Sequence, residues 1–121
     1  ANDVASDDQY SETTVACTCP HTAYRVSELF EADNFRTFVS TDVRTVELCG
    51  ALKNVIAVGA GLCDGMGASA SAKAALLRQG LKEMAAFCML YDTGGFQLGT
   101  LLCSAGVADL TVTCYAGRNR R

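Results

Sequence analysis

The longest apolar stretch of the chain, residues 46–67, reads VELCGALKNVIAVGAGLCDGMG and constrains the fold more than any other segment. A lysine and an asparagine, Lys53 and Asn54, interrupt it. An ammonium group costs free energy to bury among apolar side chains unless it has a partner or a chemical task. Lys53 is therefore the first candidate for a functional residue.

The spacing of apolar residues within this stretch predicts a helix. They recur at i, i+4, i+7, i+8 and i+11, as on the core-facing side of a helix, at Leu48, Leu52, Val55, Ile56 and Gly59. A second stripe, beside Lys53, holds mostly small residues, at Gly50, Asn54, Ala57 and Gly61. Small residues let another backbone or a ligand approach closely, so Lys53 would project into a space suited to a ligand.

The glycines of the same stretch permit a rival interpretation, in which residues 55–58 form a strand that runs into a glycine-rich turn. Gly59, Gly61 and Gly65 would then suggest a dinucleotide-binding loop. Their GxGxxxG spacing, however, is one residue longer than the GxGxxG fingerprint. The helix is the favoured interpretation.

The composition fits one domain or a piece of a larger protein. The chain has 121 residues, of which 50% are hydrophobic and 19% charged, enough apolar material for a core. A net charge of -3 gives no reason to expect nucleic-acid binding. No run reaches the ~18 uncharged apolar residues of a membrane span. The chain lacks an initiator Met and stops abruptly, so we expect an internal fragment.

Most of the seven cysteines lie inside apolar runs, where a free thiol behaves as a small hydrophobic group. This odd number of cysteines favours a reduced, intracellular protein over a disulfide framework. Cys17 and Cys19 are one residue apart, and His21 is the single histidine. That spacing predicts no metal site.

The first third of the chain has a mixed pattern. Residues 12–17 are rich in β-branched side chains and predict a strand, residues 22–32 have the apolar spacing of an amphipathic helix, and residues 35–40 predict a second strand. A strand, a helix and a strand in such a short segment are typical of the edge of a layered α/β domain.

The remainder of the chain predicts helices. They are expected at residues 73–91, 96–104 and 106–115. Ser71 is a candidate N-cap for the first of them. Asp109 and Thr113 are four residues apart and so share one helical face. They are either a solvated carboxylate and an exposed hydroxyl or, given their apolar neighbours, members of a site.

Three segments, VELCGALKNVIAVGAGLCDGMG, KAALLRQGLKEMAAF and GVADL..TCYAGRNR, occur in an order and at separations that resemble the NAD-dependent glycerol-3-phosphate dehydrogenases of eukaryotic type. The resemblance covers essentially the whole chain. It implies the α/β end of a Rossmann domain, residues 1–42, followed by the first part of an all-helical catalytic domain, residues 43–121, of the 6-phosphogluconate dehydrogenase C-terminal type. The fragment itself would be mostly α-helical and inactive on its own.

The resemblance also implies an activity, the interconversion of dihydroxyacetone phosphate and sn-glycerol 3-phosphate by hydride transfer with NADH or NAD. Lys53 matches the catalytic lysine that donates and accepts the proton. Asp109 and Thr113 match the polar pair that faces this lysine and the substrate oxygens. The implied enzyme is a cytoplasmic homodimer with no nucleic-acid partner and no membrane span.

Substrate and cofactor contacts follow from the same resemblance. Asn54 matches a substrate-contacting amide, and Arg118 and Asn119 match the pair that binds the substrate phosphate. Arg118 would also reach the dinucleotide, and Ala1 aligns with a backbone contact to NAD. Without the resemblance, the basic end at residues 118–121 could equally be a solvated cluster.

The chain departs from the family pattern at two places. Residues 67–72 read GASASA where the family usually has a loop ending in Asn-Thr, and Cys103 stands where the family commonly has Glu. Two other functions remain open. A β-hydroxyacid dehydrogenase shares the architecture and a lysine on a helix, but needs no phosphate clamp at Arg118 and Asn119. A non-enzymatic helical interaction module could carry Lys53 as a buried structural lysine.

Overall fold

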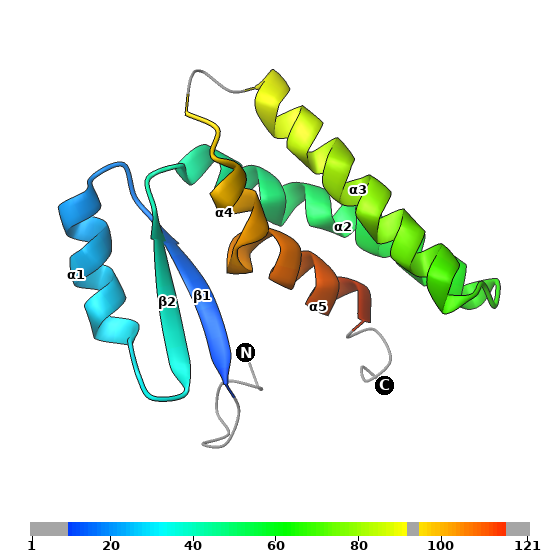
Figure 1. Ribbon diagram of the computed structural model, residues 1–121, viewed down its shortest axis with the longest axis horizontal. Helices are drawn as coiled ribbons and strands as arrows, with labels where there is room; N and C mark the ends of the chain where they lie inside the picture. The colour runs from blue at the N-terminus through cyan, green and yellow to red at the C-terminus, as the bar shows by residue number, and fades with distance from the viewer. Residues whose placement is uncertain (1–9, 92–94, 116–121) are drawn as a thin grey trace.

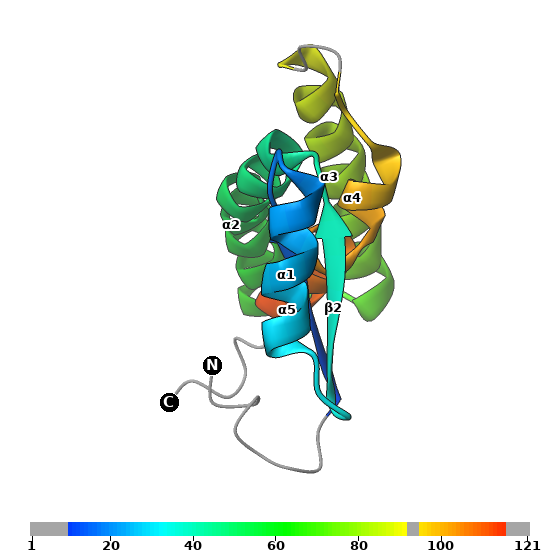
Figure 2. The ribbon, with the colours of Figure 1, turned by 90° about the vertical axis from the view of Figure 1, so that its left-hand side faces the viewer.

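The computed structural model describes residues 10–91 and 95–115 and shows a mostly helical protein with a small parallel sheet at its start (Figure 1). Figure 2 shows α1 in front of the sheet, with the other helices behind it. The sheet therefore lies between one helix and a helical layer. The elements are β1 (Ser11–Ala16), α1 (Pro20–Phe30), β2 (Phe35–Ser40), α2 (Val43–Gly65), α3 (Ala70–Leu90), α4 (Leu98–Leu102), a π-helical turn η2 (Ser104–Ala108) and α5 (Asp109–Tyr115).

The first three elements form the predicted strand–helix–strand unit. β1 and β2 pair in parallel, from Ser11 opposite Phe35 to Ala16 opposite Ser40. α1 begins at Pro20, whose missing N–H is no loss in a first helical turn. The expected boundaries were one residue late for β1 and two residues late for α1, and those of β2 were correct. This unit confirms the α/β character predicted for the start of the chain.

The apolar stretch forms one unbroken helix, α2, of 23 residues. The rival interpretation, a strand running into a glycine turn, is therefore wrong, because Gly59 and Gly61 lie within the helix. α2 ends where Gly67 adopts a left-handed φ of 68°. The N–H groups of Gly67 and Ala68 then donate to the carbonyl oxygens of Asp64 and Cys63, which closes the helix in a Schellman arrangement.

The buried side of α2 only partly follows the predicted stripe. Cys49 and Ala60 are fully buried, and Leu52 and Ile56 pack against the same core. Val55, which was expected in the stripe, is 72% exposed, and this part of the prediction is wrong. α3 and α5 both pack against α2.

Length and composition alone would allow α2 to cross a membrane, and it is the one helix among the described residues that passes this test. A core helix of a globular protein can pass the same test. Only 11% of this apolar window is buried among the described residues, but two features of α2 are those of a core helix. It packs along α3 and α5, and the charge of Lys53 at its middle is paired with Asp109. The absence of a membrane span stays a prediction.

α3 crosses α2 closely because one position on α3 has no side chain. A Cβ atom at Gly80 would lie 2.7 Å from Cδ1 of Ile56. The helix begins three residues earlier than expected, at Ala70. Its N-cap is Ser69, whose Oγ accepts from the N–H of Ala72 at 3.2 Å, so the expectation of a cap at Ser71 is wrong.

The last helices are shorter and more broken than predicted. Instead of two helices at residues 96–104 and 106–115, the chain forms α4, then η2, then α5. Cys103 has extended backbone angles, φ −88° and ψ −169°, which end α4. The chain then turns so tightly that Gly106 lies against the carbonyl of Leu101.

The core lies among α2, α3, α4 and α5, and cysteines contribute to it. Cys49, Cys88 and Cys114 are buried free thiols. Burial raises the pKa of Cys49 to about 12, and it also raises the pKa of Cys88 and Cys114. These thiols are protonated at neutral pH and fill the core as small hydrophobic groups, as predicted.

Asp42 joins the sheet, α2 and the segment before α4 through its backbone N–H and both of its carboxylate oxygens. Oδ1 accepts from the N–H of Thr45 at 3.0 Å and so caps α2. Oδ2 accepts from the N–H of Gln97 at 2.9 Å. The backbone N–H of Asp42 in turn donates to Oγ of Ser40 at the end of β2, at 3.1 Å. This buried carboxylate therefore fixes the start of the central helix.

We expect Asp42→Ala to lower the free energy of unfolding by about 2–3 kcal/mol, about 1 for the lost cap and the rest for the charge-assisted bond to Gln97. Asp42→Asn keeps one acceptor oxygen for Thr45 and should lose roughly half as much. Urea unfolding of the three proteins measures the differences. Equal stability of Asp42→Ala and wild type would show that the bridge contributes nothing.

Candidate active site

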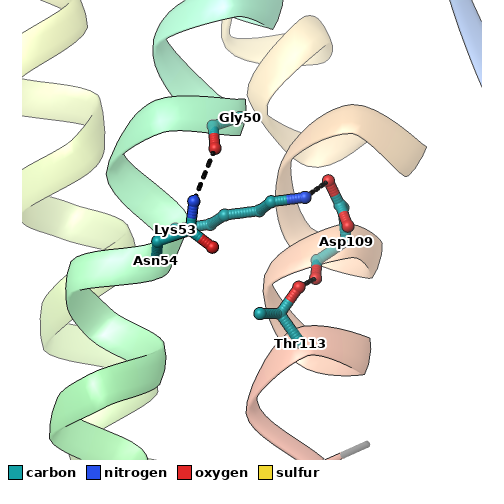
Figure 3. Close-up of polar contacts among 5 residues, drawn as sticks. All are labelled: Gly50, Lys53, Asn54, Asp109 and Thr113. Atoms are coloured by element: carbon teal, nitrogen blue, oxygen red, sulfur yellow. Dashed lines mark hydrogen bonds and ion pairs between the residues drawn. The ribbon is translucent and has the colours of Figure 1, made fainter.

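Lys53 of α2 and Asp109 of α5 meet across the space between their helices (Figure 3). The Lys53 ammonium donates a hydrogen bond to Oδ2 of Asp109 and forms an ion pair with it. The two side chains are 21% and 39% exposed. A pair this accessible to water contributes at most about 1 kcal/mol to stability. Its placement therefore matters more for chemistry than for holding the helices together.

The surrounding elements explain why the two groups meet. α2 carries Lys53 about midway along its length, on the side that packs against α5. The turn η2 ends at Ala108, and Asp109 is the first residue of α5. The tight turn at Gly106 thus brings the carboxylate back toward α2 from a position 56 residues away in the sequence.

Two further sequence-predicted residues, Thr113 and Asn54, lie near this pair. Thr113 stands one turn along α5, and its hydroxyl donates to the backbone oxygen of Asp109 at 2.6 Å (Figure 3). Asn54 is exposed and directs its amide back to the carbonyl of Gly50 at 3.4 Å. Arg118, Asn119 and Ala1 fall outside the described residues, so the structure places none of these three.

An open cleft of about 750 Å³ lies between β1 and the layer formed by α2, η2 and α5. Asp109 lines it, as does Gly50, one turn before Lys53. Lys53 itself is not among the lining residues. The cleft is lined by Tyr10, Ser11, Glu12, Thr13, Thr14, Phe35, Val46, Gly50, Ser104, Ala105, Ala108, Asp109 and Val112. The carboxylate partner of the lysine therefore faces a space between the strand unit and the helices.

The cleft also contains a polar contact that sequence reasoning missed. Oγ1 of Thr14 on β1 lies 2.6 Å from Oγ of Ser104 and 3.2 Å from Sγ of Cys103. The Cys103 thiol donates to the carbonyl of Thr100 at 2.8 Å. The sequence singled out Cys103 only as a departure from a family pattern. No pattern linked it to a strand 89 residues earlier.

Small residues line part of the cleft beside Asp109. Gly50, Ala105 and Ala108 line the cleft with little or no side chain, and a Cβ at Gly50 would meet no atom within 4 Å. This open, small-residue wall beside Asp109 has room for a flat ring. The glycines of α2 lie inside a helix and so provide no phosphate-binding loop. Within the described ranges, no group of three or more His, Cys, Asp or Glu residues could hold a metal ion.

A parallel strand–helix–strand unit at the start of the chain is followed by a helical layer, and an open cleft beside the paired Lys53 and Asp109 lies between them. These features define a mostly helical protein with an α/β start. Residues 42–121 match the family described as NAD-dependent glycerol-3-phosphate dehydrogenase C-terminus. The chain belongs to this family.

Individual relatives agree with this assignment. The chain is 51% identical over 121 residues to human cytoplasmic glycerol-3-phosphate dehydrogenase [NAD(+)], covering all of this chain and 34% of that protein. It superimposes on DsGPDH of Dunaliella salina with a TM-score of 0.88 and 40% identity, covering all of this chain and 20% of the other. For glycerol-3-phosphate dehydrogenase of Saccharomyces cerevisiae the TM-score is 0.80 and the identity 38%, over 92% of this chain and 34% of the other. The chain thus spans about a third of the length of the curated relatives it matches.

Proposed function

We infer that the protein carrying this chain interconverts dihydroxyacetone phosphate and sn-glycerol 3-phosphate by hydride transfer with NADH or NAD. Membership of the family and the names of the relatives support this activity. The observation that carries it is the Lys53–Asp109 pair beside the cleft. Reduction of a ketone needs a proton donor at the carbonyl oxygen, and the reverse reaction needs a base at the hydroxyl.

Lys53 is the catalytic residue of this proposal. In the reducing direction its ammonium gives a proton to the substrate oxygen, and in the oxidising direction its neutral amine takes one. Asp109 orients the ammonium through their hydrogen bond. Bound NADH supplies the hydride. The small-residue wall of the cleft, which includes Gly50 and Ala105, leaves room for the reacting groups beside Asp109.

The remaining predicted residues bind the substrate in this proposal. The hydroxyl of Thr113 donates a hydrogen bond to the backbone oxygen of Asp109. Its own oxygen remains free to accept a hydrogen bond from a substrate hydroxyl. Asn54 lies next to Lys53 and offers an amide to the substrate. Arg118 and Asn119 hold the phosphate, since a guanidinium fork suits phosphate oxygens. Arg118 and Ala1 also contact the dinucleotide.

The same proposal covers the wider organisation. Residues 1–42 belong to an NAD-binding Rossmann domain and residues 43–121 to the helical catalytic domain, a division supported by the family match from residue 42. The exposed apolar side chains of α2, including Val55, Val58 and Leu62, support its being covered by further protein or by a second subunit of a homodimer. The relatives' names support a cytoplasmic location.

The substrate assignment is tested by assaying the full-length protein with NADH and either dihydroxyacetone phosphate or dihydroxyacetone. We expect kcat/KM to favour the phosphorylated substrate about 10³-fold, because two charge-assisted hydrogen bonds of about 2 kcal/mol each are lost without the phosphate. The 121-residue chain alone, which supplies only part of the cofactor site, should give no turnover. A preference for an unphosphorylated hydroxyacid or ketone would instead indicate a β-hydroxyacid dehydrogenase.

A further inference from the structure

Side-chain hydrogen bonds that the proposed reaction does not use join the strand unit (β1, α1 and β2) to the helices. Oγ of Ser40, at the end of β2, lies 2.8 Å from Oγ1 of Thr100 on α4, and both residues are buried. Oγ1 of Thr14 on β1 lies 2.6 Å from Oγ of Ser104, the first residue of η2. Figure 1 shows the strands between α1 and the segment from α4 to α5. The two contacts therefore attach the sheet to this segment.

The contact at Thr14 belongs to a chain of polar groups with a definite direction. The thiol of Cys103 donates to the carbonyl oxygen of Thr100 at 2.8 Å, so its proton is in use. Oγ1 of Thr14 lies 3.2 Å from Sγ of Cys103, and the Thr14 hydroxyl can therefore donate to this sulfur. The hydroxyl of Ser104, a residue that is 6% exposed, then donates to Thr14. Loss of the Thr14 hydroxyl would deprive a buried serine of this partner.

The two contacts restrain different movements. The chain passes from the strand unit to α2 at residues 41–42, directly after Ser40. The contact between Ser40 and Thr100 thus lies next to this crossing and would by itself allow the helices to rotate about it. In the parallel register Thr14 stands opposite Phe38, two residues or about 7 Å farther along the strands. A second contact at that distance prevents the rotation.

The turn η2 links the position of Ser104 to that of Asp109. η2 starts at Ser104 and leads directly into Asp109, the first residue of α5. Gly106, in the middle of η2, lies so close to the backbone of Leu101 that no Cβ atom would fit, so the turn has little room to change shape. A shift of η2 relative to β1 would therefore move Asp109, the carboxylate partner of Lys53.

Resting on the proposed function, we propose that Thr14 is a positioning residue for hydride transfer. In that function the strand unit belongs to the part that binds NADH, and the helices carry the proton donor. Hydride and proton must reach the same carbonyl group, so the two parts need a fixed separation. Thr14, Ser104 and Asp109 line the same cleft between the strands and the helices. The hydroxyl of Thr14 fixes the width of this cleft by holding Ser104.

The test uses the full-length enzyme with Thr14→Val, which keeps the shape of the side chain and removes its hydroxyl. We expect the single-turnover rate of NADH oxidation by dihydroxyacetone phosphate, which follows hydride transfer itself, to fall about tenfold. KM for each substrate should stay within about twofold, because the change lies in neither binding site. The contact between Ser40 and Thr100 remains, so the fold should survive. Thr14→Ser keeps the hydroxyl and should stay within about threefold of the wild-type rate.

Thr37→Val is the matched control in the same sheet. The Thr37 hydroxyl of β2 donates to Oε2 of Glu31 at 2.6 Å, a contact within the strand unit, so its loss should leave the single-turnover rate unchanged. Ser104→Ala removes the other half of the contact with Thr14 and should also slow hydride transfer. The double variant should be no slower than Thr14→Val, because both changes break one contact. If Thr14→Val does not fold, the single-turnover rate of Ser104→Ala decides.

Four results would overturn the inference alone: a wild-type single-turnover rate in a folded Thr14→Val enzyme, an equal fall in Thr37→Val, additive effects of the Thr14 and Ser104 changes, or a loss confined to KM. A wild-type enzyme that neither reduces dihydroxyacetone phosphate nor binds glycerol 3-phosphate would overturn the proposed function, and this inference with it.

Discussion

Replacing Lys53 with alanine in the full-length protein is expected to lower kcat for dihydroxyacetone phosphate reduction by about 10³-fold, the usual contribution of a positioned acid or base. The fold should survive, because the Lys53–Asp109 pair is partly exposed and contributes about 1 kcal/mol or less. The loss should appear in kcat more than in KM, since the proton moves during the chemical step. Steady-state kinetics with NADH absorbance measure both constants.

The matched control is Lys82→Ala, which removes an exposed lysine from α3 and should change neither constant. Asp109→Asn keeps a hydrogen-bond acceptor for Lys53 but lacks the charge, and it should reduce kcat less than Lys53→Ala does. Circular dichroism of each variant checks the fold. A Lys53→Ala enzyme that retains more than about a tenth of wild-type kcat would refute the catalytic role.

The central helix could be predicted from the sequence because its apolar periodicity is long and its caps are local. The pairing of its Lys53 with Asp109 could not be predicted from periodicity. Lys53 and Asp109 are 56 residues apart, and no local sequence pattern predicts a contact between residues so far apart. Only the resemblance to a family connected them. The structure brings the two groups together independently, through the packing of α5 on α2.

The errors in the sequence-based prediction have physical reasons. A helical stripe shows which residues are apolar, but neighbours decide which are covered, so Val55 is exposed while Cys49 is buried. Both Ser69 and Ser71 could cap α3 by sequence. In the structure the hydroxyl of Ser69 accepts from the N–H of Ala72, so Ser69 is the N-cap. No pattern in the sequence indicated that Lys73 of α3 is buried, because its partner Asp64 lies on another helix.

We expect Gly106→Ala to lower the free energy of unfolding by about 3 kcal/mol. A Cβ atom there would overlap the carbonyl oxygen of Leu101 and lie 2.6 Å from its carbonyl carbon. These are backbone atoms, and Leu101 is itself buried in the core, so no side-chain rotation relieves the contact. The chain between α4 and α5 must shift, and Asp109 begins α5 three residues later.

Gly99→Ala is the matched control, because this exposed glycine of α4 has open space around it and alanine favours the helix. That variant should be unchanged or stabilised by about 0.5–1 kcal/mol. Urea unfolding separates the two glycines, and kcat reports whether a displaced Asp109 still orients Lys53. The turn η2 packs against the core and also positions the carboxylate of Asp109. Gly106→Ala should therefore lower both the stability and kcat. A variant that kept wild-type stability and kcat would mean that η2 can open without moving α5, and that the position of Asp109 is set by its contact with Lys53 alone.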